Sequence, residues 1–310
     1  RKKGWWYPMK RNPVFDREMK SGARNIRLPV ILVLFNGILF LVTLLNMYSA
    51  VEQVRASSSL QYSSFIEIYK LVSSMEFLLL IFIAPAVTAA SISGERERQT
   101  LDLMLTTQMT AAQVVTGKLF SALFVLLLLI FSGFPAIAMV FVYGGITWGD
   151  VVSIMMCYLA VALFAGSIGL CCSAFFKRST ISTVVTYGVL IAVLAGGYFI
   201  NKFALSLSAM DISEAAAYVF GEPSAAPSSG GLFYLFLFNP AVTFFAILSG
   251  QAGGRPMTKM CSEFGIEYSG FVLEHWISIS ILIQLVLAAA LIAAAIWAVE
   301  PVKYKKHRKN

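Results

Sequence analysis

Six runs of apolar residues, each long enough to cross a bilayer, alternate with polar segments along the chain. A membrane-spanning α-helix needs about 20 predominantly apolar residues. The six predicted transmembrane helices cover residues 28–50, 65–92, 119–143, 151–176, 181–200 and 276–299. This pattern predicts an all-α integral membrane protein whose residues 1–310 form a single transmembrane domain.

A seventh apolar stretch, residues 232–250, lies in the long segment 201–275 before the last predicted span, and Asn239-Pro240 interrupts it. The N-terminal segment and the C-terminal tail are both strongly basic. Because positive charge marks the cytoplasmic side, both termini are predicted to be cytoplasmic and the number of crossings to be even. Segment 201–275 is then external, and its apolar part is predicted to be a re-entrant pair of half-helices or an apolar helix on the outer face.

The residues before the first span predict a helix on the membrane surface. Residues 10–27 contain Asn12 as a candidate cap, Pro13 at the favoured first helical position and Asp16 in the first turn. Lysines and arginines line its polar side, and tryptophan and tyrosine precede it. These features are typical of an interfacial helix, and the alternative is a solvated basic tail.

Composition supports the membrane assignment and changes the meaning of the net charge. The chain is 58% hydrophobic and 13% charged, whereas soluble domains carry roughly 25% charged residues. The formal charge of +8 would suggest nucleic acid in a soluble protein. Here the cations lie at the ends of apolar runs, as they do in membrane proteins, so we expect membrane lipid and no nucleic acid as a partner.

Sequence motifs for catalysis and for bound cofactors are missing. The chain has no Gly-x-x-x-x-Gly-Lys-Ser/Thr motif for a nucleotide, no His-Glu-x-x-His and no Gly-x-Ser-x-Gly. Four cysteines and two histidines show no metal-ligand spacing. We therefore expect no catalytic residue, no metal site and no cofactor in this chain.

Glu76 is the most conspicuous polar residue inside a predicted span. An ionisable side chain at membrane depth costs roughly 2.5–3.5 kcal/mol on insertion scales, so it should face a cavity, a partner or the helix bundle. The hypothesis is a cavity or gate group, and the alternative is a helix-packing hydrogen bond. The other candidates for a cavity or gate are Asn36, Asn46, Asn239 and Pro240.

A charged, amphipathic insert, residues 94–118, separates the second and third predicted spans. Ser93-Gly94 is expected to break the preceding helix, and a new helix is expected to begin near Glu97. One face of that helix would be apolar, with Leu101, Met104 and Leu105 in one stripe. Thr110 is a candidate cap for a further short helix that leads into the third span. An apolar stripe outside the membrane requires a partner surface, from lipid or from protein.

This insert also resembles a known family. Ser93-Gly94-Glu95-Arg96-Glu97, followed by Thr100-Leu101-Asp102-Leu103-Met104-Leu105-Thr106-Thr107, is similar to the cytoplasmic loop of ABC-2 type transporter permeases. The resemblance extends to Asn12-Pro13-Val14, to Glu18, to Asn239-Pro240 and to the six-span layout. Gln108-Met109 departs from it, because the family often has proline and an aliphatic residue there.

The resemblance implies that the insert is a coupling element that docks on a separate ATP-binding subunit. It implies two permease copies, as a homodimer or with a sister chain, and two ATPase copies that bind ATP and magnesium, in the cell membrane of a prokaryote. The residues expected to form the docking surface are Glu95, Arg96, Glu97, Thr100, Leu101, Leu105, Thr106 and Thr107.

Three functions are therefore compared for the chain. The first is the permease subunit of an ATP-driven exporter, moving an amphipathic peptide, a drug or a similar compound. The second is a non-transporting scaffold or immunity partner that holds an ABC ATPase. The third is an ion-coupled carrier, which the scarcity of buried ionisable groups other than Glu76 disfavours.

Overall fold

The computed structural model describes residues 13–24, 26–57, 62–106, 109–142, 146–218 and 226–300, and every regular element in these ranges is helical. The helices are α1 Pro13–Arg24, α2 Arg27–Ser57, α3 Tyr62–Thr88, α4 Ser93–Glu97, α5 Thr100–Thr106, α6 Ala111–Val142, α7 Trp148–Phe175, α8 Ser179–Tyr218, the 3₁₀ helix η1 Gly230–Phe238, α9 Pro240–Gln251, α10 Pro256–Glu263, α11 Phe271–Glu274 and α12 Trp276–Val299. The predicted cap Asn12, the basic tail and Thr107 lie outside the described residues.

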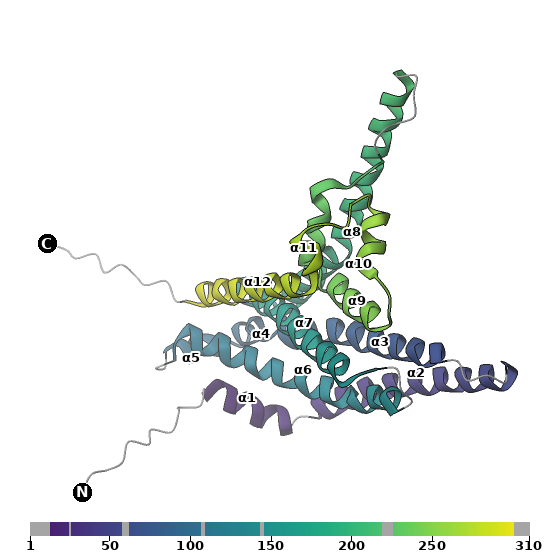
Figure 1. Cartoon of the computed structure of the whole chain (residues 1–310). Helices are drawn as coiled ribbons and strands as arrows, with labels where there is room; N and C mark the ends of the chain where they lie inside the picture. Colours follow the sequence, from purple (N-terminus) through teal and green to yellow (C-terminus); the bar gives the residue numbers. More distant parts are fainter. Residues whose placement is uncertain are drawn as a thin grey trace, which may run out of the picture.

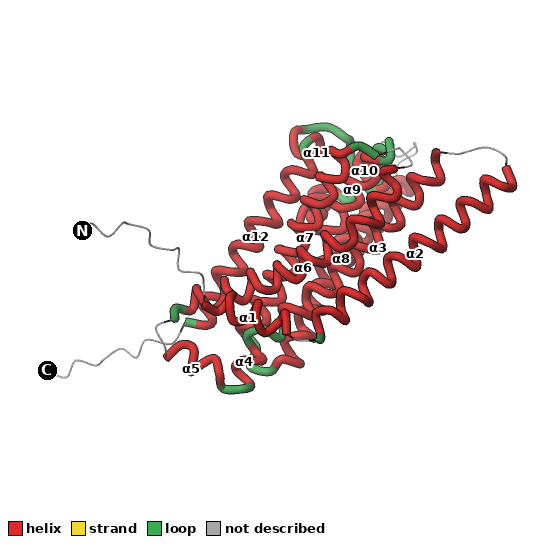
Figure 2. Tube along the Cα trace, turned by 90° about the horizontal axis from the view of Figure 1, so that it is seen from below, coloured by secondary structure: helices red, strands yellow, loops and turns green. Residues whose placement is uncertain are grey.

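Six helices in the described part of the chain are long and apolar enough to cross a membrane: α2, α3, α6, α7, α8 and α12. They correspond to the six predicted spans, so the all-α, six-span architecture is confirmed. The short helices α1, α4 and α5 gather at one end of the bundle, and α9, α10 and α11 gather toward the other end (Figures 1 and 2). We call these the α5 end and the α10 end.

Helix α7 forms the centre of the bundle, and its span is 67% buried, against 17% for α2 and 11% for α8. Its first turn is fixed by a capping box in which Thr147 and Asp150 bond each other's backbone N–H groups. In the core, Phe244 of α9 stacks on Phe77 of α3 with ring centroids 4.2 Å apart and also faces Tyr158 of α7. The helices α3, α7 and α9 therefore share one aromatic core.

Two boundaries next to the charged insert differ from the predicted ones. Helix α3 ends at Thr88, and a turn over 89–92 precedes α4, so the chain breaks before Ser93-Gly94 and not at that pair. Helix α6 begins at Ala111, so the predicted short helix is its first part, and Thr110 caps it: Thr110 N donates to Gln113 Oε1 and Gln113 N donates to Thr110 Oγ1. Reciprocal capping satisfies two otherwise unpaired N–H groups.

The fifth span was predicted too short, because α8 continues from residue 200 to Tyr218. With 40 residues it is about 60 Å long, twice the thickness of the hydrocarbon core. Its C-terminal part projects away from the bundle (Figure 1). Asn201 was expected to begin an external segment, but its side-chain amide donates to Gly197 O in its own helix and to Leu232 O in η1. The polar residue is thus accommodated inside the helix and does not end it.

The apolar stretch 232–250 is broken at Asn239, as the sequence predicts. The helices η1 and α9 meet there at 88°. Asn239 Oδ1 accepts from Ala241 N and so caps α9, while Pro240 occupies the first helical position. The two helices thus lie at about a right angle, so residues 232–250 do not form one straight helix.

Candidate functional site

A buried lysine organises the α5 end. Lys118, in the first turns of α6, is only 6% exposed and lies between two carboxylates. Its Nζ is 2.7 Å from Glu18 Oε1 on α1 and 3.1 Å from Glu95 Oε1 on α4. One ammonium group therefore ties α1 and α4 to α6, and each bond is charge-assisted.

The turn between α3 and α4 is fixed by two serines from other helices. Ser173 Oγ on α7 accepts from Ile92 N and from Ser93 N, both at 2.9 Å. Ser182 Oγ on α8 donates to Ala89 O at 2.6 Å. The free backbone groups at the end of α3 and the start of α4 thus find partners on α7 and α8, as buried backbone groups require.

Glu97 connects α4 to the beginning of α8. Its two carboxylate oxygens accept from Ser179 N at 3.0 Å and from Ser179 Oγ at 2.7 Å. Ser179 is the first residue of α8, so the carboxylate sits where the dipole of that helix favours negative charge. Glu97 is exposed to solvent but already bonded within the chain.

The helix expected to begin near Glu97 begins three residues later, at Thr100, as α5, and the short helix α4 ends at Glu97. Gln99 lies between them with φ of 58°, a left-handed conformation that a residue other than glycine seldom adopts. Thr100 Oγ1 then donates to the Glu95 carboxylate and to Glu95 O. The side chain of Thr100 thus closes the turn back onto α4.

Part of the apolar stripe of α5 is covered by the chain itself. Leu101 is 3% exposed and belongs to a cluster with Val14 of α1 and Ile92 of the turn, and Met104 is 9% exposed. The structure does not describe the side chain of Leu105. Leu101, one of the predicted docking residues, is therefore buried within this chain, and its contact with a partner stays a prediction.

Among the residues predicted to dock, Glu95 faces inward toward Lys118, Arg96 is half-buried, and Glu97 and Thr106 are exposed. The sequence interpretation left out two exposed neighbours, Arg98 and Gln99. It also missed Lys118, Ser173 and Ser182. A lysine flanking a span is common, and serines inside apolar runs carry no local signal, so these contacts could be found only from the fold.

Glu76 is completely buried in the middle of the bundle. Neither of its carboxylate oxygens has a hydrogen-bond partner among the described residues, and the same holds for Ser73 Oγ one turn away. Room for the carboxylate comes from Gly133 on α6, where an added Cβ would lie 2.6 Å from Glu76 Oε1. The helix-packing hydrogen bond considered as the alternative for Glu76 is therefore not formed by the described residues.

Two of the other predicted cavity or gate residues, Asn36 and Asn239, join helices to one another. Asn36 Nδ2 bridges α2 to Ser132 on α6 at 3.0 Å, while Asn46 Nδ2 bonds Val42 O of its own helix. Asn239 Nδ2 donates to Leu194 O on α8 at 2.7 Å, so the residue that caps α9 also attaches it to α8.

A polar cluster beside the break was missed by the sequence interpretation. Gln284 of α12 donates to Thr243 Oγ1 and to Ser280 Oγ, each at 3.0 Å. Ser280 Oγ is 2.7 Å from Leu237 O of η1, and this carbonyl accepts the hydroxyl proton. A glutamine inside an apolar span is the signal that could have revealed the cluster, because polar groups at that depth require partners.

The described contacts at the α5 end join helices to one another. Within the described ranges no three His, Cys, Asp or Glu side chains are placed to hold a metal ion. At the α5 end, two short helices are bonded to α1, α6, α7 and α8 through Lys118, Ser173, Ser182 and Glu97. A displacement of α4 and α5 would therefore be passed directly to four other helices.

These features define the class: a multi-pass membrane protein whose helices are joined at one end by a polar junction. A family model described as ABC-2 family transporter protein matches residues 13–300, nearly the whole chain. The chain belongs to this family, and it is a membrane transport component of permease type. Membership in the family implies an ABC ATPase as a partner in general. No curated protein matches the chain.

Proposed function

We propose that this chain is the permease subunit of an ATP-driven exporter and that it receives force from a separate ATP-binding subunit at α4 and α5. The observation that carries the proposal is the junction at the α5 end, where one buried lysine and three helix-end contacts join the short helices to the bundle. Family membership supports the ATPase partner, and the lack of a nucleotide motif in the sequence agrees with a separate motor.

Force on α4 and α5 would follow three connections. The turn after α3 would transmit this force to α3, and to α7 and α8 through its hydrogen bonds with Ser173 and Ser182. The hydrogen bond between Ser179 and Glu97 would move the start of α8 together with α4. The pair of ion contacts at Lys118 moves α1 together with α6. Packed helices change between discrete arrangements, so a tilt at this end would open or close the far end of the bundle.

The docking surface that we propose consists of the exposed residues of the junction. These are Glu97, Arg98 and Gln99 at the bend and Thr106 at the end of α5. The α5 end faces the cytoplasm in this proposal, in agreement with the basic N-terminal segment and tail. The α10 end, with segment 226–275, is then external.

The complex would contain two permease copies and two ATPase copies. Helices α2 and α8 are the least buried of the six candidate spans, and both expose large apolar side chains such as Leu34 and Val184. Such faces fit lipid or a second permease copy. We place the two-fold contact on these two helices, with the rest of their surface in lipid.

The proposed cargo is an amphipathic peptide, drug or similar compound that enters from the cytoplasm or the inner leaflet. Glu76 supports a pathway beside α3 and α6, because a buried carboxyl group without a partner among the described residues offers a polar contact when the helices separate. A scaffold that holds an ATPase without moving cargo would use the same junction.

Charge reversal at the bend tests the docking surface. Arg98→Glu is compared with Lys259→Glu, a reversal of an exposed cation at the α10 end. Each variant is co-expressed with an ABC ATP-binding subunit of the same organism, and the amount co-purified is measured. We expect Arg98→Glu to lower it about tenfold, since like charges opposed across an interface cost on the order of 1.4 kcal/mol or more, and Lys259→Glu to leave it unchanged.

Equal co-purification and equal ATP hydrolysis for both variants would contradict docking at α4 and α5. The assembled complex also separates the exporter from the scaffold. An exporter is expected to hydrolyse ATP faster when a transported peptide or drug is added. An intact complex whose hydrolysis responds to no member of a panel of amphipathic peptides and drugs would favour the scaffold.

A further inference from the structure

A second site lies at the α10 end, in a hollow of about 890 Å³ between α9, α10 and the start of α12. Its wall has a polar part and an apolar part. The apolar part includes Ala246, Met257, Leu273 and Ile277, and the polar part includes Arg255, Thr258, Tyr268, Glu274, His275 and Ser278. Such a wall suits a molecule with one polar and one apolar portion.

The N-terminus of α12 opens into this hollow. Trp276, Ile277 and Ser278 are its first three residues, all three line the hollow, and no side chain caps the helix. The first N–H groups of a helix have no acceptor within it, and the helix dipole adds partial positive charge there. At 24 residues, α12 is long enough for this effect to be fully developed.

An unpaired buried donor points independently to a ligand. Trp276 is 1% exposed, and its indole Nε1 has no hydrogen-bond partner among the described residues. The ring is held by packing against Phe233 of η1, with centroids 5.5 Å apart. A buried indole N–H without an acceptor is destabilising, so an acceptor atom supplied by a ligand would stabilise this wall of the hollow.

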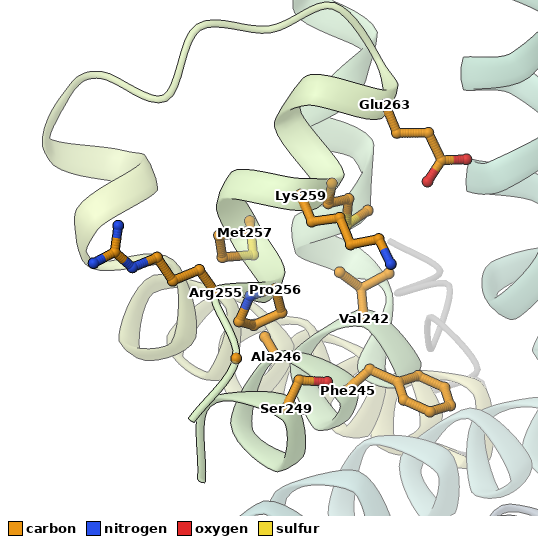
Figure 3. A pocket seen from close by; sticks show the side chains of 11 residues that line it. Val242, Phe245, Ala246, Ser249, Arg255, Pro256, Met257, Lys259 and Glu263 are labelled. Carbon is orange, nitrogen blue, oxygen red and sulfur yellow. The ribbon is translucent and has the colours of Figure 1, made fainter. Parts of the chain in front are cut away.

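The loop before α10 brings a cation to the same place. Gly253 has φ of 73°, and Gly254 N donates to Ser249 O at 2.9 Å, so the chain turns tightly back over α9 and places Arg255 at the rim. Figure 3 shows Arg255 and Lys259 pointing away from each other. Both line a smaller hollow together with Val242 and Phe245, and Arg255 lines the larger hollow as well. No carboxylate of the described residues lies within 4.0 Å of the Arg255 guanidinium.

We propose that this hollow binds the phosphate headgroup of an anionic phospholipid from the leaflet at the α10 end. The donors are the Arg255 guanidinium, the Trp276 indole and the first N–H groups of α12, and together they favour an oxyanion. The hollow lies at the end of a candidate span, which is the depth of lipid headgroups. Its apolar wall continues into α9 and α12, where an acyl chain would lie. Glu274 is the only carboxylate that lines the hollow, and it is exposed.

Retention of lipid by the purified full-length protein tests the site. The protein is placed in nanodiscs of phosphatidylcholine with one fifth phosphatidylglycerol and is then extracted into detergent. Native mass spectrometry counts the lipid molecules that stay bound. Three variants are compared. Arg255→Gln removes the cation, and Trp276→Phe removes only the indole donor. Lys259→Gln is the matched control, because it removes a nearby cation of α10 that does not line this hollow.

We expect Arg255→Gln to lower the association constant for phosphatidylglycerol about tenfold, which is the loss of one charge-assisted contact. Trp276→Phe should lower it about threefold, which is the loss of one neutral hydrogen bond. Lys259→Gln and binding of phosphatidylcholine should not change. Soluble glycerol 1-phosphate should compete only at concentrations at least a hundredfold higher, because it lacks the acyl chain.

Equal losses in Arg255→Gln and Lys259→Gln would show nonspecific attraction by surface charge and overturn the proposal. Unchanged binding in Trp276→Phe would overturn the assignment of the indole donor. If glycerol 1-phosphate binds as tightly as the lipid, the site is one for a soluble phosphate. Should Arg255→Gln fail to fold in detergent, Trp276→Phe decides alone, since it keeps the aromatic packing against Phe233.

Discussion

Removal of the buried ammonium group at the α5 end is the sharpest test of the junction. In Lys118→Met the methionine keeps most of the apolar stem, and the two carboxylates lose their shared partner. Glu95 is 15% exposed and keeps only the bond from Thr100 Oγ1, and Glu18 is 32% exposed and faces Glu95 across the vacated position. The change therefore leaves one part-buried carboxylate uncompensated and places two like charges near each other.

The burial of these side chains determines how much stability Lys118→Met should lose. Breaking a buried ion pair by removing one partner costs about 3–5 kcal/mol, and the partial exposure of Glu18 places this case at the lower end, at about 3 kcal/mol. Glu18→Gln alone removes a contact to a one-third exposed carboxylate and should cost about 1 kcal/mol or less. In the triple variant Lys118→Met, Glu18→Gln, Glu95→Gln, no uncompensated charge remains. It should recover most of the loss, since neutral replacement of a buried pair is often close to neutral in stability.

The assay is unfolding of the detergent-solubilised protein by sodium dodecyl sulfate in mixed micelles, with hydrogen exchange of α1 as a local readout. Exchange in α1 should increase in Lys118→Met, because Glu18 is the ion contact that holds this helix to α6. If the single and triple variants unfold at the same detergent fraction, uncompensated charge is not the cause of the loss. If α1 exchange does not change, Lys118 does not hold that helix.

Three further predictions concern other parts of the chain. Gly133→Ala should destabilise the wild type by about 1–3 kcal/mol through overpacking against Glu76 but not a Glu76→Ala background, and additive effects in this double-mutant cycle would refute the contact. At Gln99, whose φ is 58°, Val should destabilise by about 1–2 kcal/mol and Gly should not. Unfolding in detergent measures the stability of the Gly133 and Gln99 variants. Equal effects of the two Gln99 variants would exclude backbone strain at that position. Asn239→Ala should cost about 1–2 kcal/mol more than Asn239→Ser, which keeps a cap for α9 and loses only the bond to Leu194. Equal stability would show that the cap contributes nothing.

The six candidate spans could be predicted from the sequence because the hydropathy of the chain determines where they lie. A run of about 20 apolar residues has few stable alternatives to a membrane-spanning helix. Thr110 and Asn239 cap helices by accepting hydrogen bonds from backbone N–H groups two or three residues further along the chain. The spans and these two helix caps depend only on nearby residues, so they can be predicted without knowing the fold. The end of α8 was less predictable, because Asn201 is accommodated by a carbonyl 31 residues away.

The junction could not be predicted because all of its contacts join distant parts of the sequence. Lys118 lies 100 residues from Glu18, and Ser173 lies 80 residues from Ser93. The periodicity of α5 predicted an apolar stripe correctly, but periodicity does not say what covers it. Val14 and Ile92 lie in the same buried cluster as Leu101, so part of the stripe is internal and the surface left for a partner is smaller than expected.

Three polar residues in or beside the spans share one kind of contact, which Glu76 lacks. Asn201, Asn239 and Ser280 each donate to a backbone carbonyl of another helix, and two of these carbonyls belong to η1, beside the break between η1 and α9. A bent backbone at membrane depth requires such partners, so these residues account for the break. Glu76 has no comparable partner among the described residues, although it is the residue with the highest cost of burial. A buried carboxyl group without a partner destabilises the packed arrangement, and a polar group admitted between α3 and α6 would remove that cost. In the proposed mechanism, force from the α5 end would therefore act on the contact between Glu76 and Gly133.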